Sequence, residues 1–359
     1  AMGGGRYFTH KRESMKFIAY LAALMLCASA WAAYPYTHID DKGYKTTIAK
    51  KPSRIVIVGG MWPLPSVIML LEHSAKSIVY MPKASKNALK ASFMLELFPQ
   101  IAHIKDGENE NIEELLLLKP DLFICHNANT KLCQAMKKSG IPTIEVSVSA
   151  WGYDSYQSIK GWLTLLAPIL DKEEVAGRFL DYTQGIQKRL DEALQGEKNK
   201  PRALIIHHFD NYQSFSAGGI FANSLLQNSG AENVLQDKGI VKMTLEEAYR
   251  LNPDIIYLNN FNTLLPSDLL NNPLWQPLLA VQNKRVYKFP LGSYRPFAPS
   301  LDLPIVLLWL YQHNYPQYAD NKALLAQTQQ FYKDIFAISL TQRQAEAIFT
   351  PKKAAGEIK

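Results

Sequence analysis

One segment of this chain occurs twice, and that repetition constrains the fold more than any other feature. The stretch "NIEELLLLKPDLFI" at residues 111–124 aligns without a gap with "TLEEAYRLNPDIIY" at residues 244–257. Two further pairs of segments follow the same order, so the sequence predicts an internal duplication of a whole domain rather than a short-period repeat. These pairs are "RIVIVGG" (54–60) with "RALIIHH" (202–208), and "MLLEHSAKSIV" (69–79) with "SLLQNSGAENVL" (224–235).

Each half alternates strand-like and helix-like segments. "RIVIVGG" is a continuous apolar run rich in β-branched residues and ends in glycines, which is typical of a strand buried in a parallel sheet. A chain of 359 residues is long enough for two such units. We therefore predict the α/β class, with two Rossmann-like lobes that have parallel sheets, helices on both faces and a ligand cleft between the lobes. In the first half, strands are expected at 76–81, 121–126 and 142–148, helices at 67–73, 111–120 and 130–140, and a hairpin at 34–49.

The segment between the two halves has the pattern of one long helix. In "DKEEVAGRFLDYTQGIQKRLDEALQG", residues 171–196, apolar side chains recur at helical spacing, acids fill the first turn and a glycine ends the pattern. At about 1.5 Å per residue such a helix spans roughly 35–40 Å, the width of a domain. The expected organisation is an N-terminal lobe at 33–165, a linking backbone helix at 166–198 and a C-terminal lobe at 199–359.

The first residues have the features of a tag and a targeting signal. Residues 1–14 are glycine-rich and are interpreted as an expression-vector remnant, and residues 15–32 combine a lysine, an apolar run and a small-residue ending. This pattern predicts a secretory signal cleaved before Ala33, and hence a soluble protein of the periplasm. A lipoprotein anchored through Cys27 is the alternative, but Leu26 stands where lipid attachment favours a small residue.

Charge and cysteine content exclude several classes of function. The formal net charge is +7 for the full sequence and +4 without residues 1–32. This excess is modest and unclustered, which does not favour nucleic acid and is compatible with a small anionic ligand. Cys125 and Cys133 remain after cleavage, and either a disulfide or two buried thiols fits an exported protein. Neither a CxxC motif nor a cluster of cysteine and histidine is present, so a structural zinc is not expected.

Catalytic motifs are absent from the sequence. It contains no GxSxG, HExxH, GxxxxGK or GxGxxG pattern, so we do not expect an enzyme, and no cofactor is predicted. His126, His207 and His208 lie near strand ends, but no carboxylate stands beside them at ligand spacing. We therefore expect no directly coordinated metal.

The candidate ligand site lies in the loops that follow the strands, since open parallel sheets bind ligands beyond the carboxyl ends of their strands. Gly59–Gly60 and Gly218–Gly219 each precede a helix, and their backbone N–H groups could cradle an oxyanion, although tight turns alone also explain glycines. Arg295 is the best candidate for a charge-assisted bond to an anion. The predicted ligand-binding residues are Gly60, Met61, Trp62, Ser66, Tyr153, His208, Ser216, Gly218, Gly219, Ile220 and Arg295. Aromatic residues also crowd these loops and suit the walls of a cleft: Trp62, Trp151, Tyr153, Tyr156, Phe209, Tyr212, Phe215, Tyr294 and Phe297.

The ordered combination of these features resembles the solute-binding proteins of ABC importers, in the class with a helical backbone. The matching stretches are the signal sequence, "IDDKGYKTTIAKKPSRIVIVG", both copies of the repeated segment, the bridging helix, "FSAGGIFANSLLQNSGAENVL" and "LAVQNKRVYKFP". The resemblance covers nearly the whole mature chain. It implies a monomeric binding protein that delivers a ligand to an ABC permease dimer in the inner membrane.

The resemblance also implies a ligand class and a docking pair. Relatives carry iron-siderophores, haem, cobalamin or metal oxyanions, and the sparse set of donors here is most similar to the molybdate/tungstate-binding member of the class. The aromatic loops keep an iron-siderophore, haem or cobalamin as alternatives, and an enzyme such as a chelatase or a nitrogenase-like protein on the same scaffold is a further one. In the family one glutamate of each lobe pairs with permease arginines, and the matching positions are Glu113 and Glu246. Stabilisation of a helix dipole is the other explanation for acids at these positions.

Overall fold

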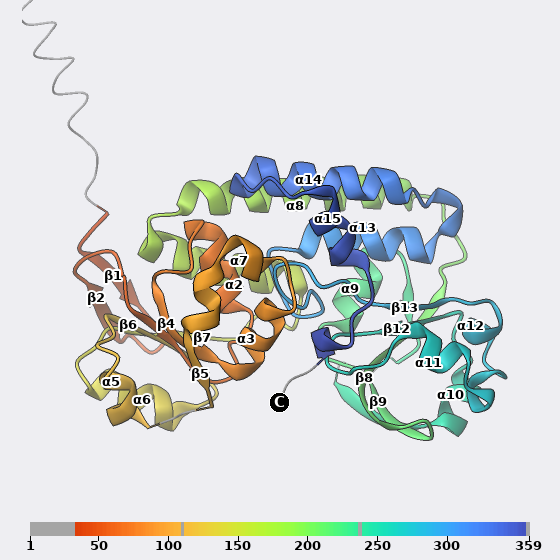
Figure 1. Cartoon of the computed structure of the whole chain (residues 1–359), viewed down its shortest axis with the longest axis horizontal. Coiled ribbons are helices and arrows are strands. Elements are labelled where there is room, and N and C mark those ends of the chain that lie inside the picture. Colours follow the sequence, from red (N-terminus) through yellow and green to blue (C-terminus); the bar gives the residue numbers. More distant parts are fainter. Residues whose placement is uncertain (1–32, 109–110, 236–238, 357–359) are drawn as a thin grey trace, which may run out of the picture.

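The computed structural model describes residues 33–108, 111–235 and 239–356, which form two α/β lobes side by side beneath a layer of long helices (Figure 1). The predicted tag, the predicted signal sequence and Cys27 lie outside these residues. In the described part of the chain, no helix combines the length and the apolar character needed to cross a membrane.

The N-terminal lobe is built on a five-stranded parallel sheet in the order β5-β4-β3-β6-β7. Its central strand β3 is buried throughout, as the β-branched run predicts. A separate antiparallel hairpin of β1 and β2 precedes the sheet, also as predicted. The strands are β1 (Tyr36–Ile39), β2 (Lys45–Ile48), β3 (Ile55–Ile57), β4 (Ile78–Pro82), β5 (Lys105–Gly107), β6 (Leu122–His126) and β7 (Thr143–Val146).

The helices of this lobe start where side chains can accept hydrogen bonds from the first turn. Asn111, Asn129 and Asp154 accept from the backbone N–H groups of α5, α6 and α7, which satisfies donors that a helix start leaves unpaired. The helices are α2 (Leu64–Glu72), α3 (Lys83–Lys90), α4 (Met94–Leu97), η1 (Pro99–His103), α5 (Ile112–Leu116), α6 (Thr130–Lys138) and α7 (Ser155–Leu170).

The sheet of the C-terminal lobe is mixed, which corrects the prediction of a wholly parallel sheet. Strands β10, β8, β12 and β13 pair in parallel, but β9 and β11 add an antiparallel edge. Strand β8 continues to Asn211 and turns directly into β9, so the stretch after His208 is a hairpin rather than a loop. The strands are β8 (Arg202–Asn211), β9 (Ser214–Gly218), β10 (Glu232–Asn233), β11 (Ile240–Thr244), β12 (Ile255–Leu258) and β13 (Val286–Lys288).

The remaining helices surround this sheet and return toward the first lobe. They are α8 (Glu173–Ala193), α9 (Ala222–Asn228), α10 (Leu245–Leu251), α11 (Pro266–Leu270), η2 (Pro273–Trp275), α12 (Leu279–Gln282), α13 (Leu303–Asn314), η3 (Pro316–Tyr318), α14 (Asn321–Phe336), α15 (Gln342–Phe349) and η4 (Ala354–Gly356).

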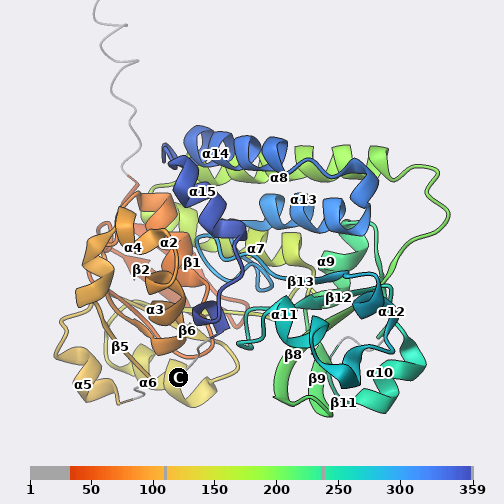
Figure 2. The same ribbon diagram turned by 45° about the vertical axis from the view of Figure 1, so that its right-hand side comes forward.

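Helix α8 lies across both lobes, with α14 beside it in both views (Figures 1 and 2). It is shorter than predicted, at about 30 Å, because Asp171 adopts a left-handed conformation (φ 55°) that ends α7 just before it. Its inner face contacts α7 of the first lobe and α9 and α13 of the second. The buried side chains on this face recur every three or four residues: Ala176, Phe179, Thr183, Ile186 and Leu190.

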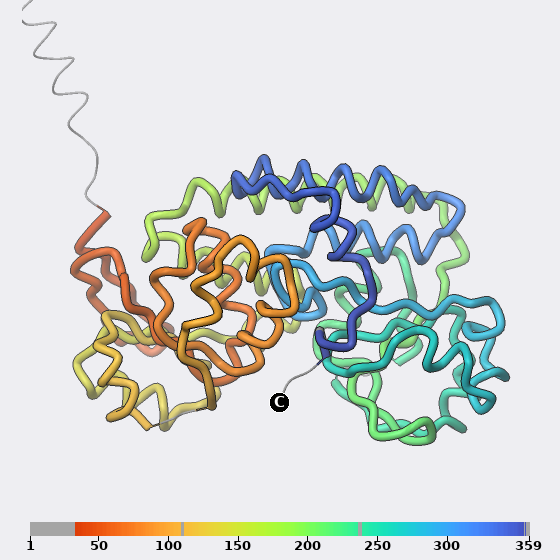
Figure 3. Tube along the Cα trace, viewed as in Figure 1, coloured from red at the N-terminus to blue at the C-terminus, as the bar shows by residue number. Residues whose placement is uncertain are grey.

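The end of the chain crosses back to the first lobe, as the trace shows (Figure 3). Arg343 on α15 pairs with Glu96 of the first lobe at 2.6 Å. The carbonyl of Phe336, at the end of α14, lies 3.0 Å from Nδ1 of His73. The segment predicted as the C-terminal lobe, 199–359, therefore also holds the two lobes together.

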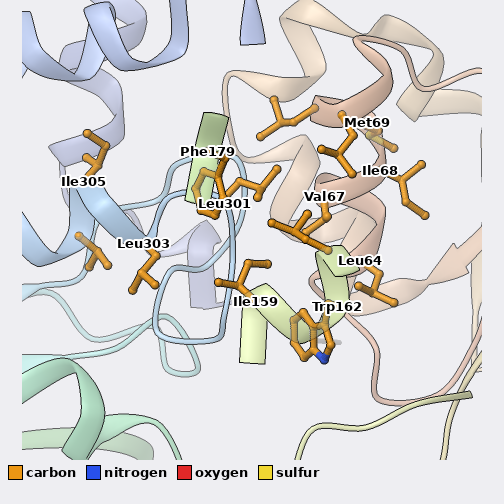
Figure 4. Close-up of a cluster of buried hydrophobic side chains, with 14 of the residues drawn as sticks. Leu64, Val67, Ile68, Met69, Ile159, Trp162, Phe179, Leu301, Leu303 and Ile305 are labelled. Carbon is orange, nitrogen blue, oxygen red and sulfur yellow. The ribbon is translucent and has the colours of Figure 1, made fainter. Parts of the chain in front are cut away.

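The apolar core is continuous across the two lobes. Buried side chains of α2, α7, α8 and the start of α13 pack in one cluster (Figure 4). Each large apolar side chain buried in this way contributes about 1.5–3 kcal/mol. A shared core of this kind favours a rigid arrangement of the lobes over a freely moving hinge.

Cys125 and Cys133 form a disulfide with their Cα atoms 5.9 Å apart. The bond joins the end of β6 to α6. The sequence is compatible with either a disulfide or two buried thiols, and the structure has the disulfide.

Candidate functional site

A cavity of 310 Å³ lies between the two lobes, beyond the carboxyl ends of their parallel strands. This is the place that the alternation of strands and helices predicts for a ligand. The first lobe lines it with Gly60, Trp62, Pro63, Val148 and Trp162, and the second with His207, His208, Ile220, Phe221, Ile240, Phe261, Tyr294, Phe297, Ala298 and Pro299.

The first-lobe wall is the turn between β3 and α2. Gly59 has φ 70°, a conformation that glycine adopts without strain, and it brings the backbone of Gly60 to the cavity. Within the described residues, no acceptor pairs with the backbone N–H groups of Gly60, Met61 or Trp62. Ser85 Oγ donates to the carbonyl of Trp62 at 2.7 Å and fixes the turn. The indole Nε1 of Trp62 is buried and has no hydrogen-bond partner in the described part of the chain.

Tyr294 lines the cavity and carries a second buried polar atom. Its side chain is fully buried, and its hydroxyl has no hydrogen-bond partner among the described residues. Burial raises the pKa of Tyr294 to about 12, so the phenol keeps its hydrogen at neutral pH. An unsatisfied buried hydroxyl is costly and indicates a place where a ligand atom can bind.

His207 contributes a third polar group. It is 7% exposed, and its Nδ1 lies 2.6 Å from Nδ2 of Asn259. Burial, together with the neighbouring His208, lowers the pKa of His207 to about 3, so the ring is neutral.

Phe261 connects the aromatic walls of the two lobes. Its ring stacks on His207 at 5.0 Å between centroids and lies 6.1 Å from Trp62 of the opposite lobe. The guanidinium of Arg295 lies 5.6 Å from the centre of the same ring. Arg295 is therefore fully buried behind the wall rather than on its surface.

A second buried cation lies close to Arg295. Lys288 is 3% exposed, and its Nζ donates to the carbonyls of Asn259 and Asn262 at 2.9 and 2.7 Å. Burial, with a contribution from the charge of Arg295, lowers the pKa of Lys288 to about 7. The two cations give this end of the second lobe a positive potential when both are protonated.

The second glycine pair supports the wall, but the N–H of Gly219 is not available to a ligand. The N–H of Gly219 donates to the carbonyl of Gly239 at 3.1 Å, so it is used inside the protein. Gly219 has φ 115°, and a Cβ there would lie 2.7 Å from Cζ of Phe297. Of the predicted residues 218–220, Ile220 lines the cavity.

We expect Gly219→Ala to lower the free energy of unfolding by about 1–3 kcal/mol, because it forces a side chain into a disfavoured φ and against Phe297. Chemical denaturation measures this change. Gly140→Ala is the matched control, since Gly140 also has a positive φ (82°) but nothing within 4 Å of its Cβ position. An equal loss in the two variants would show that contact with Phe297 has no effect.

Seven predicted ligand residues do not line the cavity: Met61, Ser66, Tyr153, Ser216, Gly218, Gly219 and Arg295. Met61 is fully buried in the core, and Ser66 Oγ donates to the carbonyl of Pro63 at 2.8 Å inside α2. Tyr153 packs edge-on against Phe221 behind the wall. Ser216 lies in β9, paired with β11. Four others, Gly60, Trp62, His208 and Ile220, do line it.

Sequence reasoning missed His207 and Phe261 as residues that line the cavity. His207 lies in "RALIIHH", and Phe261 follows the second copy of the repeated segment, "TLEEAYRLNPDIIY", so the position of both in the fold was available. What was lacking was the direction of each side chain. The rings of His207 and His208 both line the cavity, with their centroids 4.4 Å apart, where the pairing of β8 with β9 shifts register. The strict alternation of a regular strand would have placed the two side chains on opposite faces.

Metal-binding side chains do not gather in the described part of the chain. No group of three or more histidine, cysteine or acidic residues is placed to hold a metal ion there. No carboxylate occurs among the described residues that line the cavity. His126, half-buried, accepts from the N–H of Ala128 at 2.9 Å through Nδ1, which is a structural use of the ring.

The predicted docking glutamates lie on the face opposite α8. Glu113 is exposed on α5 and Glu246 is exposed on α10, and these helices are at the lower ends of the two lobes (Figures 1 and 2). Glu247 accepts from the N–H of Thr244 at 2.6 Å in a capping box. Of the two neighbouring acids at this helix start, Glu247 caps the helix and Glu246 does not.

Comparison with known proteins gives a consistent result. The model of the periplasmic binding protein family matches residues 68–291. The Fe(3+)-citrate-binding protein YfmC of Bacillus subtilis is 26% identical over 253 residues, which cover 69% of this chain and 76% of that protein. The molybdate-binding protein MolA of Haemophilus influenzae is 22% identical over 350 residues, which cover 90% and 98%.

Solved structures share the fold. A periplasmic solute-binding protein from Veillonella parvula superposes with a TM-score of 0.77 at 27% identity, covering 88% of this chain and 96% of that one. MolA bound to molybdate superposes with a TM-score of 0.70 at 19% identity, covering 85% and 99%.

Proposed function

The chain belongs to the periplasmic binding protein family, and we propose that it captures molybdate or tungstate between its two lobes and delivers the anion to an ABC permease of the inner membrane. MolA, which is similar to this chain, is the cognate periplasmic binding protein of an ABC transporter. The identity of the ligand and the residues that bind it are our proposal.

Two buried donors without partners are the observation that carries the choice of an oxyanion. Trp62 Nε1 comes from the first lobe and the Tyr294 hydroxyl from the second, and both residues line the same cavity. Leaving a buried donor unsatisfied costs about 1–3 kcal/mol. A tetrahedral oxyanion between the lobes would accept from both and from the backbone N–H groups at Gly60 to Trp62.

Charge and size support the same ligand. Arg295 and Lys288 are buried close to the second-lobe wall, and within the described residues no acidic side chain lines the cavity. This arrangement favours an anion over a free metal cation. The volume of 310 Å³ is at the low end of the range of about 300–1,000 Å³ that small-molecule sites occupy, which favours a small ligand. MolA, which is similar over almost the full length, is a molybdate-binding protein.

A small ferric chelate is the second candidate, and the aromatic walls favour it. Phe261, Phe297 and Trp62 line the cavity with broad apolar surfaces that a tetrahedral anion does not need. YfmC, which is also similar, is an Fe(3+)-citrate-binding protein.

Docking to the permease is proposed to use Glu113 and Glu246. The two side chains are exposed, come from matching positions of the repeated segment and lie on one face of the molecule. Exposed apolar residues, Leu117 at 80% and Tyr249 at 37% exposure, lie beside them. A charged pair with an apolar surround is a suitable surface for a partner with two similar halves.

Calorimetry tests the ligand. We expect molybdate and tungstate to bind the purified protein, and haem, cobalamin and ferric citrate to bind much more weakly. Binding of ferric citrate without binding of molybdate or tungstate would make the second candidate correct. Turnover of any bound compound would contradict a role limited to binding.

Removal of one donor tests the proposed site. We expect Tyr294→Phe and Trp62→Phe each to weaken molybdate binding about 10- to 100-fold, the effect of losing a hydrogen bond to a charged group. Tyr257→Phe is the matched control. That hydroxyl is also buried but bonds Asn314 at 2.6 Å away from the cavity, so its loss should leave the affinity unchanged.

A further inference from the structure

We propose that the end of the described chain, residues 350–356, is a strap that holds the two walls of the cavity together and slows the exchange of ligand. The strap leaves the end of α15 and finishes in η4, which lies against both lobes. The proposed function concerns which ligand is held, whereas the strap concerns how far the lobes can separate.

The strap starts from a helix that is fixed to both lobes. Arg343 and Gln344 at the start of α15 bond one carboxylate of the first lobe, that of Glu96, at 2.6 and 3.0 Å. At the other end of α15, the carbonyl of Ile348 accepts from the N–H of Leu291 in the second lobe at 2.9 Å. Because α15 is held at both ends, the residues that follow it leave from a fixed point.

The last turn of α15 also fixes the direction in which the strap leaves. Thr350 Oγ1 donates to the carbonyl of Glu346 at 2.9 Å. The residue that would donate to the carbonyl of Ala347 in a longer helix is Pro351, which has no N–H. Lys352 Nζ donates to that carbonyl instead. A lysine that bonds a carbonyl left open at a helix end stabilises both the end and the segment that follows.

The far end of the strap packs on the backbone of the second lobe. Gly356 is buried, and a Cβ there would lie 1.8 Å from the carbonyl oxygen of Asn262 and 2.9 Å from the backbone N of Thr263. The N–H of Gly356 donates to the carbonyl of Lys353 at 2.9 Å, which closes the turn of η4. Only glycine lets the two backbones approach so closely, so a larger residue at this position must displace η4.

The contact point on the second lobe is rigid and adjoins the cavity wall. Asn262 is buried, and its Nδ2 donates to the carbonyl of His207 at 2.9 Å. Its own carbonyl accepts from Lys288 Nζ at 2.7 Å. The preceding residue, Phe261, lines the cavity. The strap therefore contacts the short loop that carries the aromatic wall of this lobe.

On the first lobe, η4 lies against α3, which supports the opposite wall. Ser85 of α3 is fully buried, and its Oγ donates to the carbonyl of Trp62 at 2.7 Å. Trp62 lines the cavity and faces Phe261 with 6.1 Å between the ring centroids. One short segment thus contacts the elements that hold both of these facing rings.

The strap and the helices above the lobes hold the molecule at different places. Helices α8 and α14 cover the lobes on one side, and the dark blue end of the described chain lies between the lobes away from them (Figures 1 and 2). Two lobes attached along one side only can rock about that side, and a second attachment restricts this motion. Since a ligand between the lobes leaves when they separate, the strap should lower its dissociation rate constant.

Distances between the lobes test the strap without any ligand. Nitroxide labels on Lys138→Cys of α6 and Ser267→Cys of α11, both exposed positions, report the separation of the lobes by double electron–electron resonance. We expect Gly356→Leu, which displaces η4, to broaden the distribution of distances and to shift it to longer values. Ala354→Leu is the matched control, because Ala354 is exposed on the same turn. An unchanged distribution in folded Gly356→Leu and in a protein that ends at Thr350 would overturn the inference.

Ligand kinetics test the consequence, and this part rests on the proposed function because molybdate is the probe. Stopped-flow tryptophan fluorescence can follow binding, since Trp62 and Trp162 line the cavity. We expect Gly356→Leu to raise the dissociation rate constant about 10-fold and to change the association rate constant less than about threefold, with no effect of Ala354→Leu. Dissociation from Gly356→Leu at the wild-type rate would overturn the inference. If molybdate does not bind the wild-type protein, the proposed function is wrong, and the distances between the lobes still decide whether the strap acts.

Discussion

Loss of both Glu113 and Glu246 should abolish transport while leaving ligand binding intact. We expect the double variant Glu113→Ala, Glu246→Ala to reduce molybdate uptake through the cognate permease by at least about 100-fold, because each truncated charge pair costs about 2 kcal/mol or more at an interface. Uptake into proteoliposomes measures transport, and calorimetry measures affinity. Since both side chains are exposed and remote from the cavity wall, the dissociation constant should not change.

Two controls make this expectation sharp. Glu174→Ala removes an exposed acid from α8, on the opposite face, where it pairs with Arg178 at 2.6 Å, and uptake should be unaffected. Charge reversal, Glu246→Arg, should reduce uptake more than Glu246→Ala does. Normal uptake by the double alanine variant would contradict the docking assignment, and a loss of affinity would place these residues in ligand binding instead.

The duplicated architecture was predictable because buried parallel strands leave a strong pattern. Strands such as β3 and β12 are buried along their whole length, so their residues are almost all apolar. The repeated segment marks the helix and strand that follow one another in each lobe, α5 with β6 and α10 with β12. Pro120 and Pro253 recur because each lies just before its strand, where a helix has to end.

The duplication led to one wrong prediction, because the second lobe has an antiparallel edge that the first lobe does not have. The first lobe passes from β3 through Gly59–Gly60 into a helix, and the same passage was expected after His208. Instead β8 runs on to Asn211, and a tight turn leads into β9 before Gly218–Gly219 is reached. A hairpin added at the edge of a sheet does not disturb the core, so the shared core pattern carries no signal of it.

The site was predictable by location but not by side-chain direction. Trp62 and Ile220 were found because their loops follow strands, whereas Ser66 was assigned a ligand role although its hydroxyl bonds the preceding turn of α2. The ring of His207 is held by a hydrogen bond with Asn259, 52 residues away, and no local sequence pattern indicates that partner. Long-range pairs of this kind are set by the register of the sheet, and the sequence alone does not give that register.

We expect Asp302→Ala to lower the free energy of unfolding by about 3–5 kcal/mol, the cost of breaking a buried, hydrogen-bonded charge. Asp302 is 4% exposed, and its Oδ2 accepts from Ser293 Oγ at 2.7 Å and from the N–H of Tyr294 at 3.2 Å. Its Oδ1 accepts from the hydroxyl of Tyr332 on α14. The carboxylate therefore ties the loop that carries Tyr294 to the helix that lies along α8. Chemical denaturation measures the loss.

Asp302→Asn distinguishes the hydrogen bonds from the charge. Burial raises the pKa of Asp302 above its ordinary 3.8, although hydrogen bonds from Tyr332 and Ser293 oppose the rise. The native state then binds the proton more tightly than the unfolded state, so this contribution to stability is complete below pH 3.8 and is lost as pH rises through the raised pKa. The deficit of Asp302→Asn relative to wild type should thus be larger in acid than at neutral pH. If the deficit of Asp302→Asn is the same in acid and at neutral pH, the charge of Asp302 does not destabilise the native protein. If Asp302→Ala lowers the free energy of unfolding by less than about 1 kcal/mol, Tyr294 is held in place by its own packing.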